Sequence, residues 1–239
     1  MRVVRDIVRS LYGSVGEWYL RPWLTHEWRN APRDEINERP IEYTFVLKWL
    51  WQLSPSRVLD VGTGMSAWPH LLASSGYRVT AVDRKARNWW RPGRFNRHYL
   101  VLDDDITASR LTEAYDAVTA ISVVEHIPDH GAAMRGMFDR IRVGGHVLVT
   151  CPYRDDRYVE NVYALPDAGY NRDAGYVCQV FSRAEVEGWV SENGGVVLAQ
   201  EYYRIFSGDL WSFGARIHPP LRADRDEPHH LTCIVMQKG

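Results

Sequence analysis

The stretch RVLDVGTGMSAW, residues 57–68, decides the fold of this chain, because a short apolar run leads through an acid, Asp60, to two glycines. Gly62 and Gly64 have no Cβ, so the backbone there can adopt dihedral angles closed to other residues and approach a ligand closely. A helix that begins near Ser66 would add unpaired amide donors to the same turn. The pattern predicts a ligand-binding turn between a strand and a helix.

The rest of the chain alternates short β-rich runs with helical segments. Because the runs are almost wholly apolar, we expect a parallel sheet covered by helices on both faces. The expected architecture is an α/β fold, with a doubly wound, mostly parallel, Rossmann-like sheet of seven strands and an antiparallel last strand. Strands are expected at residues 57–61, 78–83, 98–103, 115–122, 145–151, 196–206 and 229–237. Helices are expected at residues 66–75, around Lys85, and at 108–114, 129–142 and 181–195. In the last of these, Ser182 is the expected N-cap and Glu185 closes a capping box.

Residues 1–55 precede this alternation and are predicted to form an N-terminal helical cap. Val3, Ile7 and Leu11 recur at helical spacing, with arginines on the other side of the helix. Such a basic amphipathic helix can also lie on a membrane, but packing against the domain is the expected use. A second helix is expected at residues 41–53. The main domain is expected at residues 56–239, with an insertion at 152–181 after the fifth strand.

Different ligands would suit the glycine turn. A phosphate-binding P-loop needs a Lys-Ser/Thr pair after the second glycine, and the sequence has none there. A dinucleotide site fits better, because Gly62, Gly64 and Ala67 have its spacing and Asp83 could accept a ribose hydroxyl. Asp60 favours a third ligand, since a carboxylate beside the turn would repel a pyrophosphate but attract an ammonium or sulfonium group.

Five segments in order make the chain resemble the class I S-adenosylmethionine-dependent methyltransferases. They are VLDVGTG, the acid Asp83 that ends the second strand, DDDIT, YDAVTAISVVEHI and IRVGGHVLVT, all within residues 57–150. Ser66 departs from the pattern, since many members of the family have a third glycine there. The resemblance implies that residues 56–239 form a methyltransferase domain. It implies S-adenosyl-L-methionine as the cofactor and S-adenosyl-L-homocysteine as its product.

The resemblance also implies a cofactor site. Asp83 would hold the ribose hydroxyls, and Asp105 with Ile106 would contact the adenine, with Asp104 as the runner-up for the acid. The expected cofactor-binding residues are Asp60, Gly62, Thr63, Gly64, Asp83, Arg84, Asp104, Asp105, Ile106, Ser122 and Val123.

Glu125 and His126 are the candidate catalytic residues, because they follow the fourth strand and should face the cofactor cleft. Methyl transfer from a sulfonium is an in-line displacement in which positioning matters most. A general base is needed only if the nucleophile must lose a proton. His126 is the best candidate for that base, because its ordinary pKa lies near neutrality. Glu125 is expected to orient the cofactor or the loop.

The expected acceptor is an oxygen or nitrogen of a small organic molecule: a metabolite, a sugar or a natural product. Aromatic residues near the N-terminus and in the 152–181 insertion suit such a pocket. An RNA or protein acceptor is the alternative, and the basic stretch at residues 84–97 could follow a phosphate backbone. The formal net charge of −1 and the absence of an Asn/Asp-Pro-Pro-aromatic motif disfavour nucleic acid. An NAD-dependent oxidoreductase and a non-catalytic binding module also remain open.

Cys151, Cys178 and Cys233 lie far apart, which predicts buried thiols and neither a disulfide framework nor a zinc site. No other metal-ligand cluster is visible, so no metal is expected. The N-terminal stretch has no continuous apolar core, so it is not expected to be a signal peptide. No run approaches the length needed to span a bilayer. The expected location is the cytoplasm.

Overall fold

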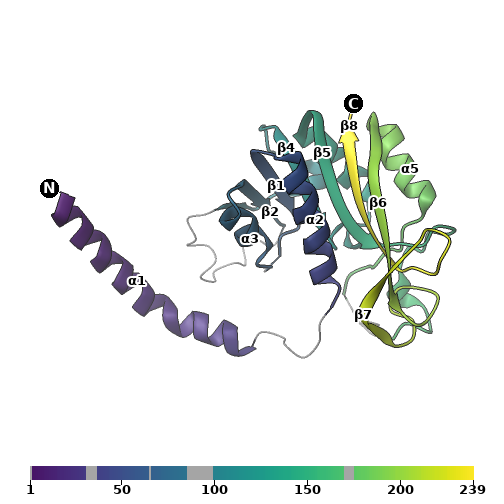
Figure 1. Cartoon of the computed structure of the whole chain (residues 1–239), viewed down its shortest axis with the longest axis horizontal. Helices are drawn as coiled ribbons and strands as arrows, with labels where there is room; N and C mark the ends of the chain where they lie inside the picture. Colours follow the sequence, from purple (N-terminus) through teal and green to yellow (C-terminus); the bar gives the residue numbers. More distant parts are fainter. Residues whose placement is uncertain (1, 31–36, 65, 85–98, 170–174) are drawn as a thin grey trace.

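The computed structural model describes residues 2–30, 37–64, 66–84, 99–169 and 175–239. One eight-stranded sheet, in the order β3-β2-β1-β4-β5-β8-β6-β7, organises the described chain (Figure 1). The strands are β1 (Arg57–Val61), β2 (Arg78–Val82), β3 (Tyr99–Leu102), β4 (Tyr115–Ile121), β5 (Ile141–Pro152), β6 (Gly195–Phe206), β7 (Arg216–Ala223) and β8 (Leu231–Lys238). The α-helices are α1 (Arg2–Asn30), α2 (Arg39–Leu53), α3 (Trp68–Ser74), α4 (His130–Arg140) and α5 (Arg183–Glu192). The described residues also form the short 3-10 helices η3 (Ile106–Ala108), η4 (Val124–His126) and η5 (Val162–Ala164).

The parallel half of the sheet confirms the predicted doubly wound class. Strands β1 to β5 pair in parallel, and the side chains of the central strands β1 and β4 are almost wholly buried because helices cover both faces. From β1 the chain first runs outward through β2 to β3, and β4 then returns to pair with β1 on its other side. This reversal of strand order opens a crevice at the carboxyl ends of β1 and β4, where open α/β sheets bind ligands.

The sheet has one strand more than the seven expected. β8 lies antiparallel between β5 and β6, as an antiparallel last strand requires, but β7 adds an edge beyond β6. Pro219 and Pro220 interrupt the β-pattern of this segment in the sequence. An edge strand tolerates proline, because one side of its backbone needs no partner in the ladder. These two prolines explain why the sequence pattern did not predict β7, which the sheet accommodates as an edge strand.

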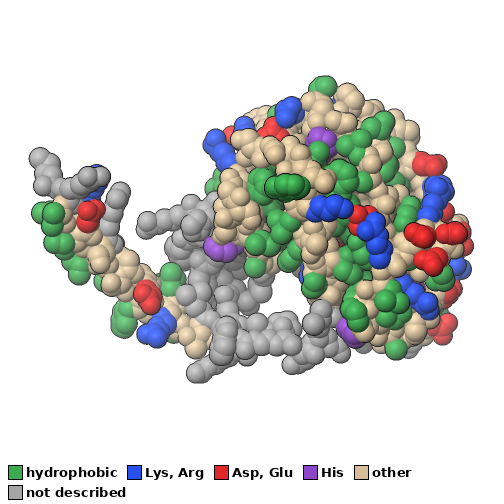
Figure 2. Space-filling view, viewed as in Figure 1, with side chains coloured by type: hydrophobic (Ala, Val, Ile, Leu, Met, Phe, Trp, Pro, Cys, Tyr) green, Lys and Arg blue, Asp and Glu red, His purple; other side chains and the backbone are tan. Residues whose placement is uncertain are grey.

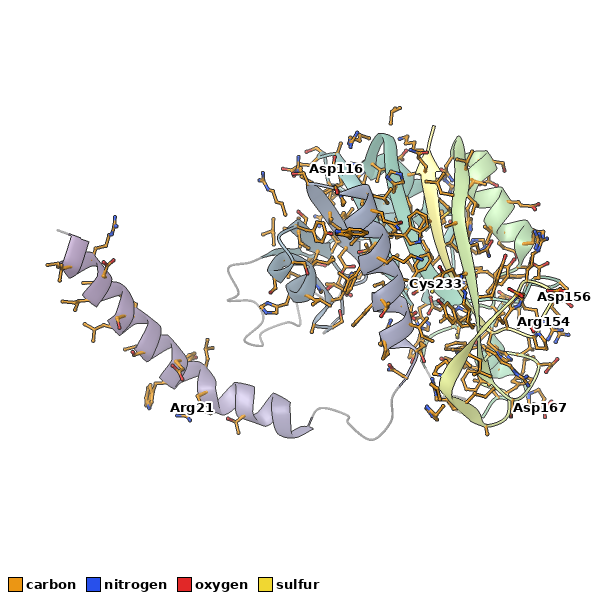
Figure 3. The ribbon with its side chains drawn as sticks, in the orientation of Figure 1. Arg21, Asp116, Arg154, Asp156, Asp167 and Cys233 are labelled. Atoms are coloured by element: carbon orange, nitrogen blue, oxygen red, sulfur yellow. The ribbon has the colours of Figure 1, made fainter. Side chains whose placement is uncertain are left out.

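Two apolar clusters, one on each face, hold the helices to the sheet. On one face α2 and α3 pack through Phe45, Leu50 and Leu72, and α2 crosses the sheet in the foreground of Figure 1. On the other face α4 and α5 pack through Phe138 and Trp189. Cys151, Cys178 and Cys233 are buried free thiols, as predicted; Figure 3 labels Cys233 within the body of the sheet.

The N-terminal cap forms only in part. α2 packs on the sheet, but α1 lies apart from it in Figure 1, and its aromatic side chains Tyr12, Trp18 and Tyr19 are exposed. The expectation that the first helix covers the domain is therefore wrong, because its apolar side chains find no buried surface in the described chain. These aromatics line no acceptor pocket in the described chain either.

The helix expected at 108–114 is also absent, apart from the last residue of η3. Asp104 accepts hydrogen bonds from the Ser109 hydroxyl at 2.6 Å and from the Arg110 amide at 3.1 Å, which holds that segment in an irregular path. Side-chain bonds of this kind compete with helix formation. The helix expected around Lys85 and most of the basic 84–97 stretch lie outside the described residues.

Candidate functional site

A cavity of about 210 Å³ lies at the carboxyl ends of β1 and β4, where the strand order reverses. The N-terminal part of α2 and the start of α3 complete its wall. Its lining residues are Arg39, Tyr43, Asp60, Val61, Gly62, Thr63, Gly64, Ser66, Trp68, Ile121 and Ser122. The structure thus gathers five of the predicted cofactor residues, Asp60, Gly62, Thr63, Gly64 and Ser122, around one cavity. Asp116, by contrast, lies near the start of β4, at the opposite end of the strands from the cavity (Figure 3).

The glycine turn after β1 needs both of its glycines. Gly62 has φ 68°, and a Cβ there would lie 2.3 Å from Cγ1 of Val123, so no other residue fits. Gly64 has φ 53° and lines the cavity, and its amide donates to Oδ2 of Asp83 at 2.9 Å. Asp83 therefore ties the turn to the end of β2. Val123, predicted to contact the cofactor, supports the turn from behind.

Asp60 is a buried carboxylate with one oxygen satisfied. Its Oδ1 accepts from the hydroxyl of Thr119, its register partner on β4, at 2.8 Å. Oδ2 is buried and has no hydrogen-bond partner among the described residues. Burial raises the pKa of Asp60 to about 7; the hydroxyls of Thr119 and Thr63 act against this shift, and the negative charge of Asp83 adds to it. A cationic hydrogen-bond donor in the cavity would give Oδ2 a partner and would favour the ionised form of Asp60.

A guanidinium on the same cavity comes from a residue that the sequence analysis missed. Nη1 of Arg39 donates to Oε2 of Glu42 at 3.0 Å and to the carbonyl of Ile121 at 3.1 Å. Arg39 begins α2 and lines the cavity with Asp60. The sequence signal was the segment ERPIE, residues 38–42, in which a proline opens a helix between two acids. The segment lies in the expected N-terminal cap, outside the five motifs of the resemblance, so no local pattern assigns it a role.

Glu42, also missed, joins α2 to the ends of β4 and β5. Its carboxylate is fully buried, and Oε1 accepts from the hydroxyls of Ser122 and Thr150, each at 2.6 Å. Burial raises the pKa of Glu42, while the charge of Arg39 opposes this shift. Ser122 has φ 48°, a left-handed conformation. Two hydrogen bonds hold it in place: its hydroxyl donates to Glu42, and its backbone amide donates to the Thr150 carbonyl.

Asp104 and Asp105, in the acidic segment after β3, have different roles. Asp104 is buried, and its oxygens accept from Ser109 and Arg110, so it braces the loop. Asp105 caps η3, with Oδ1 accepting from the amide and hydroxyl of Thr107, while Oδ2 lies 3.4 Å from Nε of Arg84. Ile106 is buried beside it. Of the two acids, Asp105 is the more accessible.

Glu125 and His126 lie in η4, shortly after β4, but neither is among the residues that line the cavity, so their expected place at the cofactor cleft stays a prediction. The carbonyl of Val177, from the 152–181 insertion, lies 2.7 Å from Nδ1 of His126, which assigns Nδ1 as the protonated nitrogen. Nε2 then carries the lone pair, 3.7 Å from Oε1 of Glu125. Burial lowers the pKa of His126, so the ring is neutral at pH 7.

Glu125 is buried, and its Oε2 has no hydrogen-bond partner among the described residues. Burial raises the pKa of Glu125 to about 8, so the carboxyl is largely protonated at neutral pH. The insertion holds this loop from outside, since Gln179 donates through its amide and side chain to the carbonyl of Glu125. A neutral acid beside a neutral imidazole is an arrangement that can hold or move one proton.

The described residues contain no group of three His, Cys, Asp or Glu side chains placed to hold a metal ion. None of the described helices has the length and apolarity to cross a bilayer.

Comparison with known proteins identifies the family to which the chain belongs. A family model described as a methyltransferase domain matches residues 29–200. A ubiquinone biosynthesis O-methyltransferase from Alkalilimnicola ehrlichii is 28% identical over 154 residues, covering 62% of this chain and 61% of the relative. A second, from Pseudomonas fluorescens, is 26% identical and covers 62% and 64%. The chain thus spans about six-tenths of the length of these curated relatives.

Solved structures share the fold. The 1,6-didemethyltoxoflavin-N1-methyltransferase of Burkholderia thailandensis, with S-adenosylhomocysteine bound, has a TM-score of 0.59 at 15% identity, covering 96% of this chain and 89% of that one. The N-methyltransferase NodS of Bradyrhizobium japonicum, also with S-adenosylhomocysteine, has a TM-score of 0.58 at 18% identity, covering 93% and 98%. At such identities the likeness concerns the fold. The fold is that of the class I S-adenosylmethionine-dependent methyltransferases. The chain belongs to the methyltransferase domain family.

Proposed function

We propose that the protein transfers a methyl group from S-adenosylmethionine to a small organic acceptor. The observation that carries this proposal is a pair of opposite charges on one cavity: the buried carboxylate of Asp60 and the guanidinium of Arg39. An amino-acid group carries an ammonium and a carboxylate, which these two side chains complement. A diphosphate would instead face the Asp60 charge, which argues against the NAD-dependent oxidoreductase.

The remaining cofactor contacts are proposed from the residues that lie next to the glycine turn. We propose that Asp83 accepts the ribose hydroxyls, since its carboxylate lies beside the Gly64 amide, and that Asp105 and Ile106 bound the adenine. Thr63 and the glycine amides would line the space between these groups. When bound, the sulfonium cofactor supplies an already activated methyl group.

His126 is proposed as the general base for the acceptor. Its Nδ1–H bond to Val177 fixes the tautomer, and the lone pair on Nε2 can then take a proton from a nucleophile. A hydroxyl must lose its proton on methylation, which supports oxygen as the methylated atom. The curated relatives are named as O-methyltransferases, in agreement with this choice. Glu125, in its neutral form, would orient the loop beside it.

The 152–181 insertion is proposed to build the acceptor pocket. Tyr176 stands edge-on to His126 at 4.8 Å between ring centroids, and Tyr163 stands edge-on to Tyr176 at 6.1 Å. Aromatic rings beside the base suit a flat, largely apolar acceptor with a hydroxyl group. We therefore propose a small phenolic or similar aromatic alcohol. Nothing described in the structure favours RNA or protein as the acceptor.

A methyl-donor turnover assay against a panel of phenols, alcohols and amines tests this proposal. We expect His126→Gln to lower kcat by about 100-fold or more, the range for loss of a general base, while S-adenosylhomocysteine affinity stays within about twofold. His146→Gln, on β5 and away from the cavity, is the matched control and should behave as wild type. Undiminished turnover by His126→Gln would show that His126 is not the base.

A further inference from the structure

Helix α1 exposes a broad apolar surface that no described part of the chain covers. Trp18 is 79% exposed and Val3 is 70% exposed, so both side chains lie largely open to solvent. Figure 2 shows hydrophobic side chains along the outer side of this helix, with charged side chains among them. The exposed large apolar residues are Val3, Val4, Ile7, Val8, Leu11, Tyr12, Val15, Trp18 and Tyr19. A surface of this kind marks an interaction site.

The width of the apolar surface identifies the kind of partner. At 100° per residue these side chains cover roughly half of the helix circumference, from Val3 round to Tyr12. A two-stranded coiled coil uses a narrower seam and places opposite charges beside it. A coiled-coil seam along α1 would run through Val4, Val8 and Leu11. The positions beside that seam hold the uncharged residues Ile7, Tyr12, Ser14 and Tyr19. The two charged positions beside the seam are both arginines, Arg5 and Arg21.

The charge of the helix points the same way. Residues 2–21 carry four arginines and two acids, although the whole chain has a net charge of −1. Tyr12, Trp18 and Tyr19 are amphipathic aromatics of the type that settles at the boundary between lipid and water. Pro22 lies inside the helix at the next position of the seam, where it would interrupt a longer coiled coil. A basic helix with a broad apolar face suits an anionic lipid surface.

We propose that α1 docks the protein on an anionic phospholipid bilayer, lying in the plane of the surface without crossing it. The apolar side chains enter the boundary layer, and Arg5 and Arg21 face the lipid phosphates. Gly13 and Gly16 weaken the isolated helix, so the bilayer would also stabilise its structure. The attachment concerns α1, and the cofactor cavity, at the carboxyl ends of β1 and β4, takes no part in it.

Co-sedimentation of the full chain with vesicles tests the proposal. Vesicles of phosphatidylcholine mixed with phosphatidylglycerol should bind the protein at low salt, and vesicles of phosphatidylcholine alone should bind it much more weakly. The double variant Leu11→Ser/Trp18→Ser should lose about tenfold or more in partitioning, because two large apolar side chains are removed from the lipid boundary. Arg5→Glu/Arg21→Glu should weaken binding to the anionic vesicles only.

Trp51→Ser is the matched control, since Trp51 is 74% exposed but lies on α2. It should sediment as wild type, and all variants should keep their melting temperature and their S-adenosylhomocysteine affinity. Failure of wild type to bind anionic vesicles would overturn the proposal, as would equal binding by the Leu11→Ser/Trp18→Ser variant. A wild-type dimer that this variant dissociates, without vesicle binding, would assign α1 to a second copy and overturn it too.

Discussion

Asp60 combines a cost to folding with a use in binding. Its Oδ2 is buried and has no hydrogen-bond partner in the part of the chain that the structure describes, an arrangement that destabilises the folded protein and is typical of functional sites. The raised pKa of about 7 expresses the same cost, since burial disfavours the charged form. A ligand ammonium beside Oδ2 would supply the missing partner.

Asp60→Asn should therefore lower affinity for S-adenosylhomocysteine by about 100-fold, because an amide cannot neutralise an ammonium in a buried site. Wild-type affinity should also fall as the pH drops below about 7, where the Asp60 carboxylate takes up a proton. The variant should show no such loss from this group. Isothermal titration between pH 6 and 8 measures both effects, and equal affinity of the two proteins would contradict the assignment.

Glu42 is predicted to be a positioning residue for the cofactor cavity. It holds the Arg39 guanidinium on one oxygen and the Ser122 and Thr150 hydroxyls on the other. Glu42→Gln would place an NH₂ group against one of these donors. Since two donors cannot form a hydrogen bond with each other, that contact would be lost. We expect KM for the methyl donor to rise about tenfold, with kcat changed less than threefold, because Arg39 is displaced while the acceptor side stays intact.

Steady-state kinetics with varied donor concentration checks this split between KM and kcat. Glu113→Gln is the control, since Glu113 pairs with Arg57 away from the cavity. A fall in kcat with unchanged KM for the donor would contradict a role at the cofactor. Rescue of the donor KM by Glu42→Asp, even in part, would support the need for a charge at this position.

The residues of the site were predictable where a local motif defines them. Asp60, Gly62, Gly64 and Asp83 all lie at strand ends that the sequence pattern identifies. Arg39 and Glu42 were not predicted, because their partners Ile121, Ser122 and Thr150 are about 80 to 110 residues away in sequence. A contact across that separation follows from the register of the folded sheet and has no local pattern.

At the scale of elements, the turn after β1 depends on close packing against the loop after β4. Gly62→Ala would bring a methyl group to within 2.3 Å of the Val123 side chain at a positive φ. We expect a loss of about 2–4 kcal/mol in the free energy of unfolding, together with loss of cofactor binding. Urea denaturation and titration with S-adenosylhomocysteine measure the two effects.

Gly76→Ala gives a matched comparison, because Gly76 also has a positive φ but a Cβ there would meet no atom within 4 Å. It should lose only about 1 kcal/mol from backbone strain and should bind the cofactor normally. Equal stability losses in the two variants would mean that the packing against Val123 is not the cause.

The elements themselves differ in how far the sequence could predict them. β1 was predicted to the residue and α5 to within three residues at each end, because an apolar run and the Ser182–Glu185 capping box are local signals. β7 was missed because its prolines break the pattern that defines a strand. The 108–114 helix was wrongly predicted because Asp104 captures the segment by hydrogen bonds. The first error arises because an edge strand tolerates proline, and the second because hydrogen bonds to a side chain five and six residues away compete with the helix.

For the whole molecule, the buried carboxyl groups set how stability depends on pH. Glu125 has a pKa raised to about 8, far above its unfolded value, so the stability it contributes is present in acid. That stability is lost as the pH rises from about 5 through 8, when the buried group must ionise. Glu125→Gln cannot ionise, so its stability relative to wild type should rise by about 1–3 kcal/mol between pH 5 and pH 9.

Urea denaturation of both proteins at pH 5, 7 and 9 checks this difference. Glu113→Gln again serves as the control, because Glu113 is exposed and should add no pH dependence of this kind. A constant difference between Glu125→Gln and wild type across the range would show that Glu125 ionises normally in the folded protein.

The central claim is that the cavity between Asp60 and Arg39 holds the amino-acid end of an adenosyl cofactor. Isothermal titration of the wild-type protein with S-adenosylhomocysteine and, separately, with NAD tests it most directly. We predict saturable one-to-one binding of S-adenosylhomocysteine that both Asp60→Asn and Arg39→Gln weaken by about tenfold or more, and no binding of NAD. Saturable binding of NAD, with no heat from S-adenosylhomocysteine, would contradict the account.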